Sequence, residues 1–226
     1  MKNRQIVFTA PGVAELLENE VGEPGAGHVL VKTVYSTVSS GTERANLVGD
    51  TNVSTARGSG DGPAVFPRTL GYCSSAVVQA VGEGVRSVKP GDEVACSWGK
   101  HSEYQLIDEG NVHKLEPGNT MRDAALGLIA TFPTAAIRKC GLEIGESAIV
   151  MGLGVLGLLA VQLLRAAGAC PVIAADPTPE KRDKAMSLGA DAALDPFAPL
   201  AIDLREQPGG VYYVKIGNDR FTIVKQ

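Results

Sequence analysis

The alternation of apolar and polar positions divides the chain into two regions. In the first 115 or so residues, short alternating runs recur between Gly, Pro and Asp turns. They predict strands over 6–9, 14–21, 28–35, 75–81, 104–107 and 112–115, a further strand from about Val94, and one short helix over 43–48. This spacing of short strands is typical of an all-β barrel or sandwich.

After Pro117 the period of the apolar positions becomes helical. Residues 121–141 read as a helix that Pro133 interrupts, and Thr120 followed by Asp123 is a capping signal at its start. The pattern then alternates between strands and helices, with strands over 147–151, 172–175 and 192–194 and helices over 158–167, 179–189 and 199–207. Such alternation predicts a parallel, doubly wound α/β sheet.

The last residues depart from that series. Residues 210–216 and 220–225 are two strand candidates separated by a tight Gly-Asn-Asp turn, which predicts an antiparallel hairpin. The stretch from 147 to 226 has room for one mononucleotide-binding half and part of the next. We therefore expect a β region over 1–116 and a short α/β region over 117–226.

A glycine-rich motif lies at the centre of the α/β region. The apolar strand that ends at Met151 runs into Gly152-Leu153-Gly154-Val155-Leu156-Gly157, and the third glycine opens an amphipathic helix. The next strand ends at Asp176, 19 residues after Gly157. A G-x-G-x-x-G motif in this strand–helix–strand setting is the dinucleotide-binding fingerprint, in which the helix N-terminus receives the pyrophosphate. Asp176 is expected to accept the ribose hydroxyls and to repel a 2′-phosphate, which favours NAD(H) over NADP(H).

Composition narrows the classes of partner. The net charge of −4 argues against a general nucleic-acid or acidic-membrane surface, and no apolar run approaches the length of a bilayer span. The first residues contain no signal-peptide core, and the four cysteines, Cys73, Cys96, Cys140 and Cys170, form no C-x-x-C pair. We expect a cytoplasmic protein with free, buried thiols, a small-molecule substrate and no nucleic-acid or membrane partner, and the composition also allows a homo-oligomer.

Several motifs together resemble the medium-chain dehydrogenase/reductase family, the zinc-type alcohol dehydrogenases and their relatives. They are PGAGHVLV (24–31), SGTE (40–43), LGY (70–72), VGEGV (81–85), VKPGDEV (88–94) and the glycine fingerprint (152–157), within a match over about residues 4–200. The resemblance implies a GroES-like β domain over 1–116 followed by a C-terminally short Rossmann domain over 117–226. It also implies hydride transfer with a nicotinamide cofactor.

At the positions that match the family's zinc ligands, this chain has residues of other types. Where zinc-dependent members carry Cys, His with Glu, and Cys or Asp, this chain has Ser40, Tyr72 with Cys73, and Ala130. The family's second zinc uses four closely spaced cysteines, and here only Cys96 is present. Zinc prefers thiolate, imidazole or carboxylate ligands, so the sequence predicts a zinc-free protein.

Without a metal, a hydroxyl has to stabilise the alkoxide that develops in carbonyl reduction. Tyr72 occupies a ligand position and is the candidate, with Ser40 and Glu43 orienting it or relaying a proton; alternatively, Tyr72 fills the vacated pocket and Glu43 bonds backbone near a helix start. The resemblance also places Lys181 near the cofactor ribose and Thr134 near the nicotinamide, although a solvated lysine and a locally bonded hydroxyl are equally compatible with the sequence.

Two functions follow from these observations. The first is a zinc-independent oxidoreductase that moves hydride between NAD(H) and a small alcohol, carbonyl compound or activated alkene. The alternative is a non-catalytic dinucleotide-binding protein, or a shortened remnant of such an enzyme. His101 and His113 are expected at the surface, and Trp98 is expected to pack or to line a substrate pocket.

Overall fold

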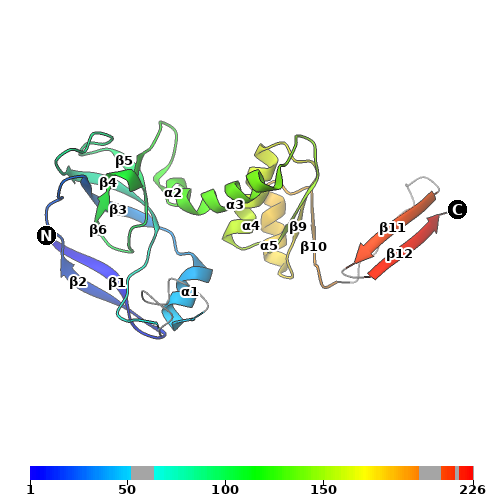
Figure 1. Ribbon diagram of the computed structural model, residues 1–226, viewed down its shortest axis with the longest axis horizontal. Helices are drawn as coiled ribbons and strands as arrows, with labels where there is room; N and C mark the ends of the chain where they lie inside the picture. Colours follow the sequence, from blue (N-terminus) through cyan, green and yellow to red (C-terminus); the bar gives the residue numbers. More distant parts are fainter. Residues whose placement is uncertain (52–63, 199–209, 217–218, 226) are drawn as a thin grey trace.

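A computed structural model describes residues 1–51, 64–198, 210–216 and 219–225. The structure has an antiparallel β region, a parallel sheet with helices, and a separate hairpin, which follow one another along the molecule (Figure 1). The predicted helix over 199–207 and residues 52–63 lie outside the described residues.

The β region is built on a five-stranded antiparallel sheet. Its order is β6-β3-β4-β5-β7, and the strands are β3 (His28–Ser36), β4 (Cys73–Val81), β5 (Glu93–Ser97), β6 (Tyr104–Asp108) and β7 (Val112–Lys114). Strands β1 (Lys2–Ala10) and β2 (Val13–Glu20) pair with each other as a hairpin. The predicted strands are therefore confirmed, with ends that differ by a few residues.

Branched apolar side chains on the sheet close the core of this region. The core contains Val29, Val31, Ala76, Val78, Val88, Val94, Cys96, Ile107 and Val112, all buried. Valine and isoleucine suit a pleated surface that is covered on one face, which explains why these runs form the central strands. Helix α1 (Ser40–Val48) follows β3 and ends at Gly49, whose φ of 73° is the left-handed conformation of a helix C-cap.

The predicted helix over 121–141 is broken after residue 124 and not at Pro133. Helix α2 (Met121–Ala124) is followed by α3 (Gly127–Cys140), and Pro133 lies buried inside α3 instead of interrupting it. Thr120 caps α2, because its hydroxyl accepts the backbone N–H of Asp123 at 3.1 Å. Proline has a φ that suits a helix and removes only one backbone hydrogen bond. Pro133 and Ile129 are the buried residues of α3, and this burial keeps the helix continuous.

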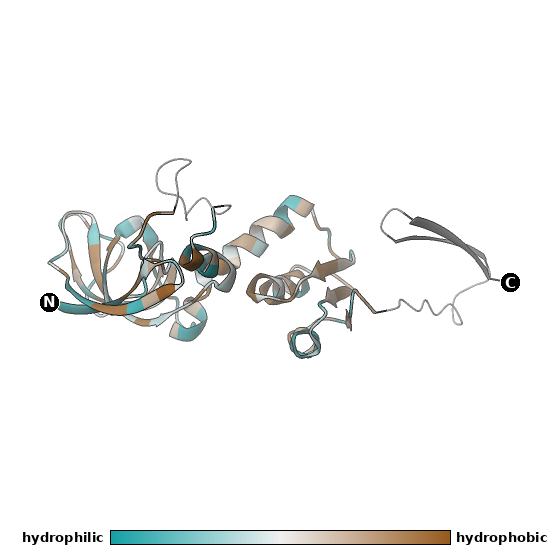
Figure 2. Cartoon of the chain, turned by 90° about the horizontal axis from the view of Figure 1, so that it is seen from below, coloured by the Kyte–Doolittle hydropathy of each residue, from teal (hydrophilic) through white to brown (hydrophobic). Residues whose placement is uncertain are grey.

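The α/β region contains a three-stranded parallel sheet in the order β10-β9-β8. The strands are β8 (Ala148–Met151), β9 (Val172–Ala175) and β10 (Ala192–Leu194), and the connecting helices are α4 (Val155–Ala166) and α5 (Pro179–Ser187). Helix α4 is mostly apolar and α5 mostly hydrophilic (Figure 2). The core lies where α4 covers the strands and includes Val150, Leu153, Val161, Leu164 and Val172.

Strand β8 has a partner on one side only among the described residues. Beside its open edge, Ile149 and Met151 are 58% and 71% exposed, and they line an apolar hollow of about 620 Å³ together with Phe132 and Leu156. Strands β11 (Gly210–Ile216) and β12 (Asp219–Lys225) form a separate antiparallel hairpin, as the sequence predicted.

Two further expectations meet the structure here. All four cysteines are free, but only Cys73 and Cys96 are buried, whereas Cys140 and Cys170 are exposed. Burial raises the pKa of the Cys96 thiol to about 12. None of the helices in the described part of the chain has the length and hydrophobicity of a transmembrane span. The boundary between residues 116 and 117 and the cytoplasmic location remain predictions.

Candidate functional site

The glycine fingerprint forms the turn between β8 and α4. Gly152 has a φ of 90°, which glycine adopts without strain, and its N–H donates to the carbonyl oxygen of Ala175 at 2.8 Å. Helix α4 begins at Val155 with Gly154 as its cap, two residues before Gly157, where the sequence predicted the helix to open. No side chain caps this terminus, so its first N–H groups and its partial positive charge remain available to an anion.

The second and third glycines have different physical requirements. A Cβ atom added to Gly157 would overlap the carbonyl oxygen of Gly152, so this position needs glycine for close packing of helix against strand. A Cβ atom added to Gly154 would meet no atom within 4 Å. The folded chain therefore does not require glycine at 154, whereas a pyrophosphate lying against the backbone would.

Asp176 is fixed against this loop. Its carboxylate is buried; Oδ2 accepts the N–H of Leu153 at 2.8 Å and Oδ1 accepts the N–H of Thr178 at 2.9 Å. These two donors, Leu153 first, lower the pKa of Asp176 to about 2. The charge that is expected to read the ribose is thus ionised across the physiological range and held beside the fingerprint.

Two cations on α5 contact Asp176, one at its carboxylate and one at its backbone carbonyl. Nζ of Lys181 lies 3.6 Å from Oδ2 of Asp176, and the Lys181 side chain is 47% exposed. Nη1 of Arg182 donates to the backbone carbonyl of Asp176 at 2.7 Å. The structure therefore brings Asp176, Lys181 and the loop together, and their role in holding the adenosine half of a dinucleotide remains a prediction.

Thr134 is not part of that group. It is exposed on α3, and its hydroxyl donates to the carbonyl of Ala130 at 2.8 Å, which is the local bond considered as the alternative. It borders a hollow with Gly127 and Arg138, whereas Gly152 and Gly157 of the fingerprint border a different hollow. A role for Thr134 near the nicotinamide therefore remains a prediction.

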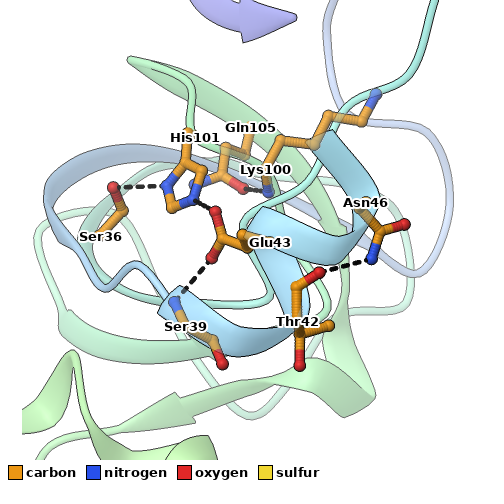
Figure 3. Close-up of polar contacts among 8 residues, drawn as sticks. All are labelled: Ser36, Ser39, Thr42, Glu43, Asn46, Lys100, His101 and Gln105. Atoms are coloured by element: carbon orange, nitrogen blue, oxygen red, sulfur yellow. Dashed lines mark hydrogen bonds and ion pairs between the residues drawn. The ribbon is translucent and has the colours of Figure 1, made fainter. Parts of the chain in front are cut away.

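A buried polar network surrounds Glu43 in the β region (Figure 3). Oε2 of Glu43 lies 2.7 Å from Nε2 of His101, and Oε1 accepts the N–H of Ser39 at 2.9 Å. The other ring nitrogen of His101 lies 2.9 Å from the hydroxyl of Ser36. His101 is 6% exposed, so its predicted surface position is wrong: the chain folds the loop after β5 over the start of α1.

Tyr72 and Ser40 are not part of this hydrogen-bonded network. The rings of Tyr72 and Trp98 are 5.9 Å apart, and the N–H of Trp98 donates to the carbonyl of Tyr72 at 2.8 Å. Trp98 has a φ of 57°, which is unusual for a residue other than glycine, and it is 66% exposed. Ser40 is exposed at the first residue of α1. In the described structure, no hydrogen bond or ion pair joins the side chains of Tyr72, Ser40 and Glu43.

Comparisons with known proteins agree with this architecture. A family model described as zinc-binding dehydrogenase matches residues 155–215. The chain is 31% identical to an S-(hydroxymethyl)glutathione dehydrogenase of Escherichia coli O157:H7, over 87% of this chain and 64% of the relative. It superposes on the 2R,3R-butanediol dehydrogenase of Bacillus subtilis with a TM-score of 0.73 and 25% identity, over 86% of this chain and 63% of that one.

In sequence and fold, this chain is similar to the zinc-type medium-chain dehydrogenases/reductases. Two further structures share its fold. One is an Escherichia coli CFT073 protein described as a short chain alcohol dehydrogenase, in complex with NADH, with a TM-score of 0.74, 24% identity and coverage of 86% and 62%. The other is a Sinorhizobium meliloti protein described as a zinc-binding dehydrogenase, bound to NADP, with a TM-score of 0.77, 24% identity and coverage of 93% and 68%. The chain spans 64% of the length of the curated relatives that it matches.

The residues at the family's zinc positions do not fit a zinc ion. The Cys73 thiol donates to the carbonyl of Ala125 at 2.8 Å, and both oxygens of Glu43 are hydrogen-bonded within the protein. Ser40 and Ala130 offer no thiolate, imidazole or carboxylate. Within the described residues, no three His, Cys, Asp or Glu side chains are grouped as a metal site would require.

The sequence did not predict that Ser36 and His101 belong to the polar network around Glu43. Ser36 ends a strand and His101 stands in a loop 58 residues after Glu43, and neither belongs to a local motif. Gly99, directly after Trp98, was a local sign of an irregular loop there.

Proposed function

We propose that this chain is a nicotinamide-dependent oxidoreductase that transfers hydride between NAD(H) and a small alcohol, carbonyl compound or activated alkene. The observation that carries the proposal is the position of Asp176, whose carboxylate accepts the N–H of Leu153 within the glycine fingerprint. A carboxylate at the end of the second strand of a βαβ unit is the group with which such sheets recognise an adenosine ribose.

The cofactor-binding residues have separate roles in this proposal. Gly152, Gly154 and the uncapped start of α4 would hold the pyrophosphate, and Gly157 keeps that helix close to β8. Asp176 would accept the ribose hydroxyls, with Lys181 beside it. The bound nicotinamide supplies the hydride donor or acceptor.

NAD(H) is the preferred cofactor in this proposal. A carboxylate with a pKa of about 2 repels a 2′-phosphate at neutral pH, while Lys181, 3.6 Å from Oδ2, partly offsets that repulsion. The two structural neighbours hold NADH and NADP respectively, so the family's fold accommodates both. The charge on Asp176 is the feature that favours NAD(H).

The catalytic part of the proposal is independent of zinc. Tyr72 is partly buried and keeps a phenolic hydroxyl that can stabilise negative charge on a substrate oxygen. Ser40 is exposed and can assist without breaking an existing side-chain bond. Glu43 is 4% exposed and bonded at both oxygens, so its contribution would pass through His101 instead of reaching the substrate directly.

One observation favours the alternative of a non-catalytic dinucleotide-binding protein. Doubly wound sheets bind ligands where the strand order reverses, beside the first strand. In the described residues, β8 is paired on one side only, so this crevice is formed from one side. That arrangement provides the adenosine and pyrophosphate half of a site more fully than the nicotinamide half.

Cofactor titration followed by a turnover screen separates these functions. The fluorescence of NADH and NADPH is measured during titration with the purified chain, and alcohols, aldehydes and quinones are then screened for absorbance change at 340 nm, a standard assay wavelength. Binding of NADH with turnover supports the oxidoreductase, and binding without turnover over the panel supports the alternative. Absence of binding to either dinucleotide contradicts both.

A further inference from the structure

Ser36, His101 and Glu43 form a continuous hydrogen-bonded chain across three segments. The hydroxyl oxygen of Ser36 is 2.9 Å from Nδ1 of His101, and Nε2 of the same ring is 2.7 Å from Oε2 of Glu43. Ser36 ends β3, Glu43 lies in the first turns of α1, and His101 follows β5 (Figure 3). Hydroxyl, imidazole and carboxylate therefore stand in the order of a nucleophile, a base and a group that orients the base.

The partners of Glu43 determine which nitrogen of the ring carries hydrogen. An ionised carboxylate only accepts hydrogen bonds, and Glu43 already accepts the N–H of Ser39 at 2.9 Å. The contact with Glu43 then requires the hydrogen of a neutral ring on Nε2. In that neutral tautomer Nδ1 is an acceptor, to which the hydroxyl of Ser36 can donate. The arrangement thus holds a base against the Ser36 hydroxyl.

The two ends of this hydrogen-bonded series, Ser36 and Glu43, differ in solvent exposure. Glu43 and His101 are 4% and 6% exposed, whereas Ser36 is exposed. Ser36 and His101 border an open depression of about 330 Å³. Its other walls include Ile6, Leu16 and Val34, which are apolar, and Arg4, whose guanidinium bonds Glu103 through Nε and Nη2. The hydroxyl end is therefore open to a small molecule while the carboxylate end is shielded from water.

We propose that Ser36 is the nucleophile of an acyl-transfer site that hydrolyses small carboxylic esters, separate from the dinucleotide site. Ser36 Oγ forms a bond to the ester carbonyl carbon and transfers its proton to Nδ1 of His101. The bond from that carbon to the leaving oxygen breaks, and the alcohol departs with the proton. Water then attacks the acyl-Ser36 ester, yields its proton through His101, and releases the carboxylic acid with Ser36 regenerated.

The shape and charge of the depression define the substrate class. Apolar walls from β1, β2 and β3 suit a short aliphatic acyl group, and the volume limits its size. Arg4 borders the same depression as an ion pair with Glu103, and its guanidinium is the cationic donor nearest to a carbonyl oxygen that gains negative charge during attack. Glu43 acts as a positioning residue, because it contacts the imidazole and not the substrate.

A purely structural network has the same hydrogen bonds, so the reactivity of Ser36 is the property to measure. The full chain is treated with a fluorophosphonate probe, the labelled residue is located by mass spectrometry, and p-nitrophenyl acetate hydrolysis is followed in parallel. Labelling of Ser36 and hydrolysis that Ser36→Ala abolishes support the proposal. An unlabelled Ser36, or hydrolysis unchanged in Ser36→Ala, overturns it. Ser187→Ala is the matched control, since Ser187 bonds a carbonyl and should leave both readouts unchanged.

The conservative variant Glu43→Gln tests the orienting role. A glutamine cannot accept from both Ser39 and Nε2, so the ring loses the tautomer that keeps Nδ1 as a base. Labelling of Ser36 should fall on the order of 10²–10⁴-fold, the usual contribution of a general base. With three histidines in the chain, nitrogen NMR can read the tautomer of His101 directly. A hydrogen on Nδ1 in the unsubstituted chain overturns the proposal, as does undiminished labelling in a folded Glu43→Gln variant. NADH titration of Ser36→Ala, expected to be unchanged, keeps this result separate from the oxidoreductase proposal.

Discussion

Oε2 of Glu43 lies 2.7 Å from Nε2 of His101, and both side chains are buried although 58 residues separate them in the chain. A buried carboxylate requires partners, and this one has the imidazole and the N–H of Ser39. Since both oxygens are engaged, Glu43 links the start of α1 to the loop after β5. This relationship removes Glu43 from direct contact with a substrate and connects it to Ser36.

The second and third fingerprint glycines should respond differently to alanine. Gly154→Ala meets no atom in the folded chain, so we expect an unchanged unfolding midpoint and NADH affinity reduced about 10-fold or more, equivalent to about 1.4 kcal/mol. Gly157→Ala collides with the Gly152 carbonyl and should lower the free energy of unfolding by about 1–3 kcal/mol. Thermal unfolding and NADH fluorescence measure the two effects. Equal loss of stability in both variants would contradict these separate roles.

Asp176→Asn should reduce the preference for NADH over NADPH. The amide removes the charge that repels a 2′-phosphate, and its oxygen can still accept the N–H of Leu153. We expect the ratio of the two dissociation constants to fall about 10-fold, or about 1.4 kcal/mol. Lys184→Gln, at an exposed position in the last turn of α5, serves as a charge-change control. An unchanged ratio in Asp176→Asn would mean that another group reads the ribose.

The same carboxylate should make stability decrease in acid. The N–H groups of Leu153 and Thr178 lower the folded pKa of Asp176 to about 2, whereas an unfolded aspartate has a pKa of about 3.9. A depressed folded pKa gives stability that is present above the unfolded value and lost as pH falls from about 4 through about 2. The difference in urea stability between the unsubstituted chain and Asp176→Asn should shrink over that window. A difference that stays constant from pH 7 to pH 2 would contradict this linkage.

Metal analysis should find substantially less than one zinc per purified chain. The groups nearest the family's zinc positions are bonded within the protein, through Cys73 to Ala125 and Glu43 to His101. Added zinc should therefore leave the unfolding temperature unchanged, because an ion that binds the folded state raises it. Stoichiometric zinc, or a rise in that temperature that a chelator reverses, would show that these side chains rearrange to bind metal.

A matched pair of isoleucines tests the packing of the helical connection. Ile129 is 0% exposed on α3, whereas Ile144 is 90% exposed in the connection that follows it. Ile129→Val should lower the free energy of unfolding by about 0.5–1.5 kcal/mol, and Ile144→Val should change it little. Urea denaturation compares the two variants. Equal effects would mean that α3 is not packed as the structure shows.

Local patterns predicted the regular elements because their determinants lie within a few residues. A β-branched run predicted β3, alternation predicted β4, and the spacing of glycines predicted the fingerprint. Pro133 misled the helix prediction, since burial of its face preserves α3. The start of α4 was placed at Gly157 because the local pattern does not show that Gly154 serves as the cap.

The sequence by itself determined the βαβ unit, the position of Asp176 after its second strand and the absence of zinc-type residues at Ser40 and Ala130. These properties depend on residue identity and short spacing. Only the tertiary structure decided that Asp176 bonds the loop at Leu153 and that Glu43 and Ser36 meet at His101. The physical reason is that burial removes water as a hydrogen-bond partner, so a polar side chain must bond whichever distant group the fold brings to it.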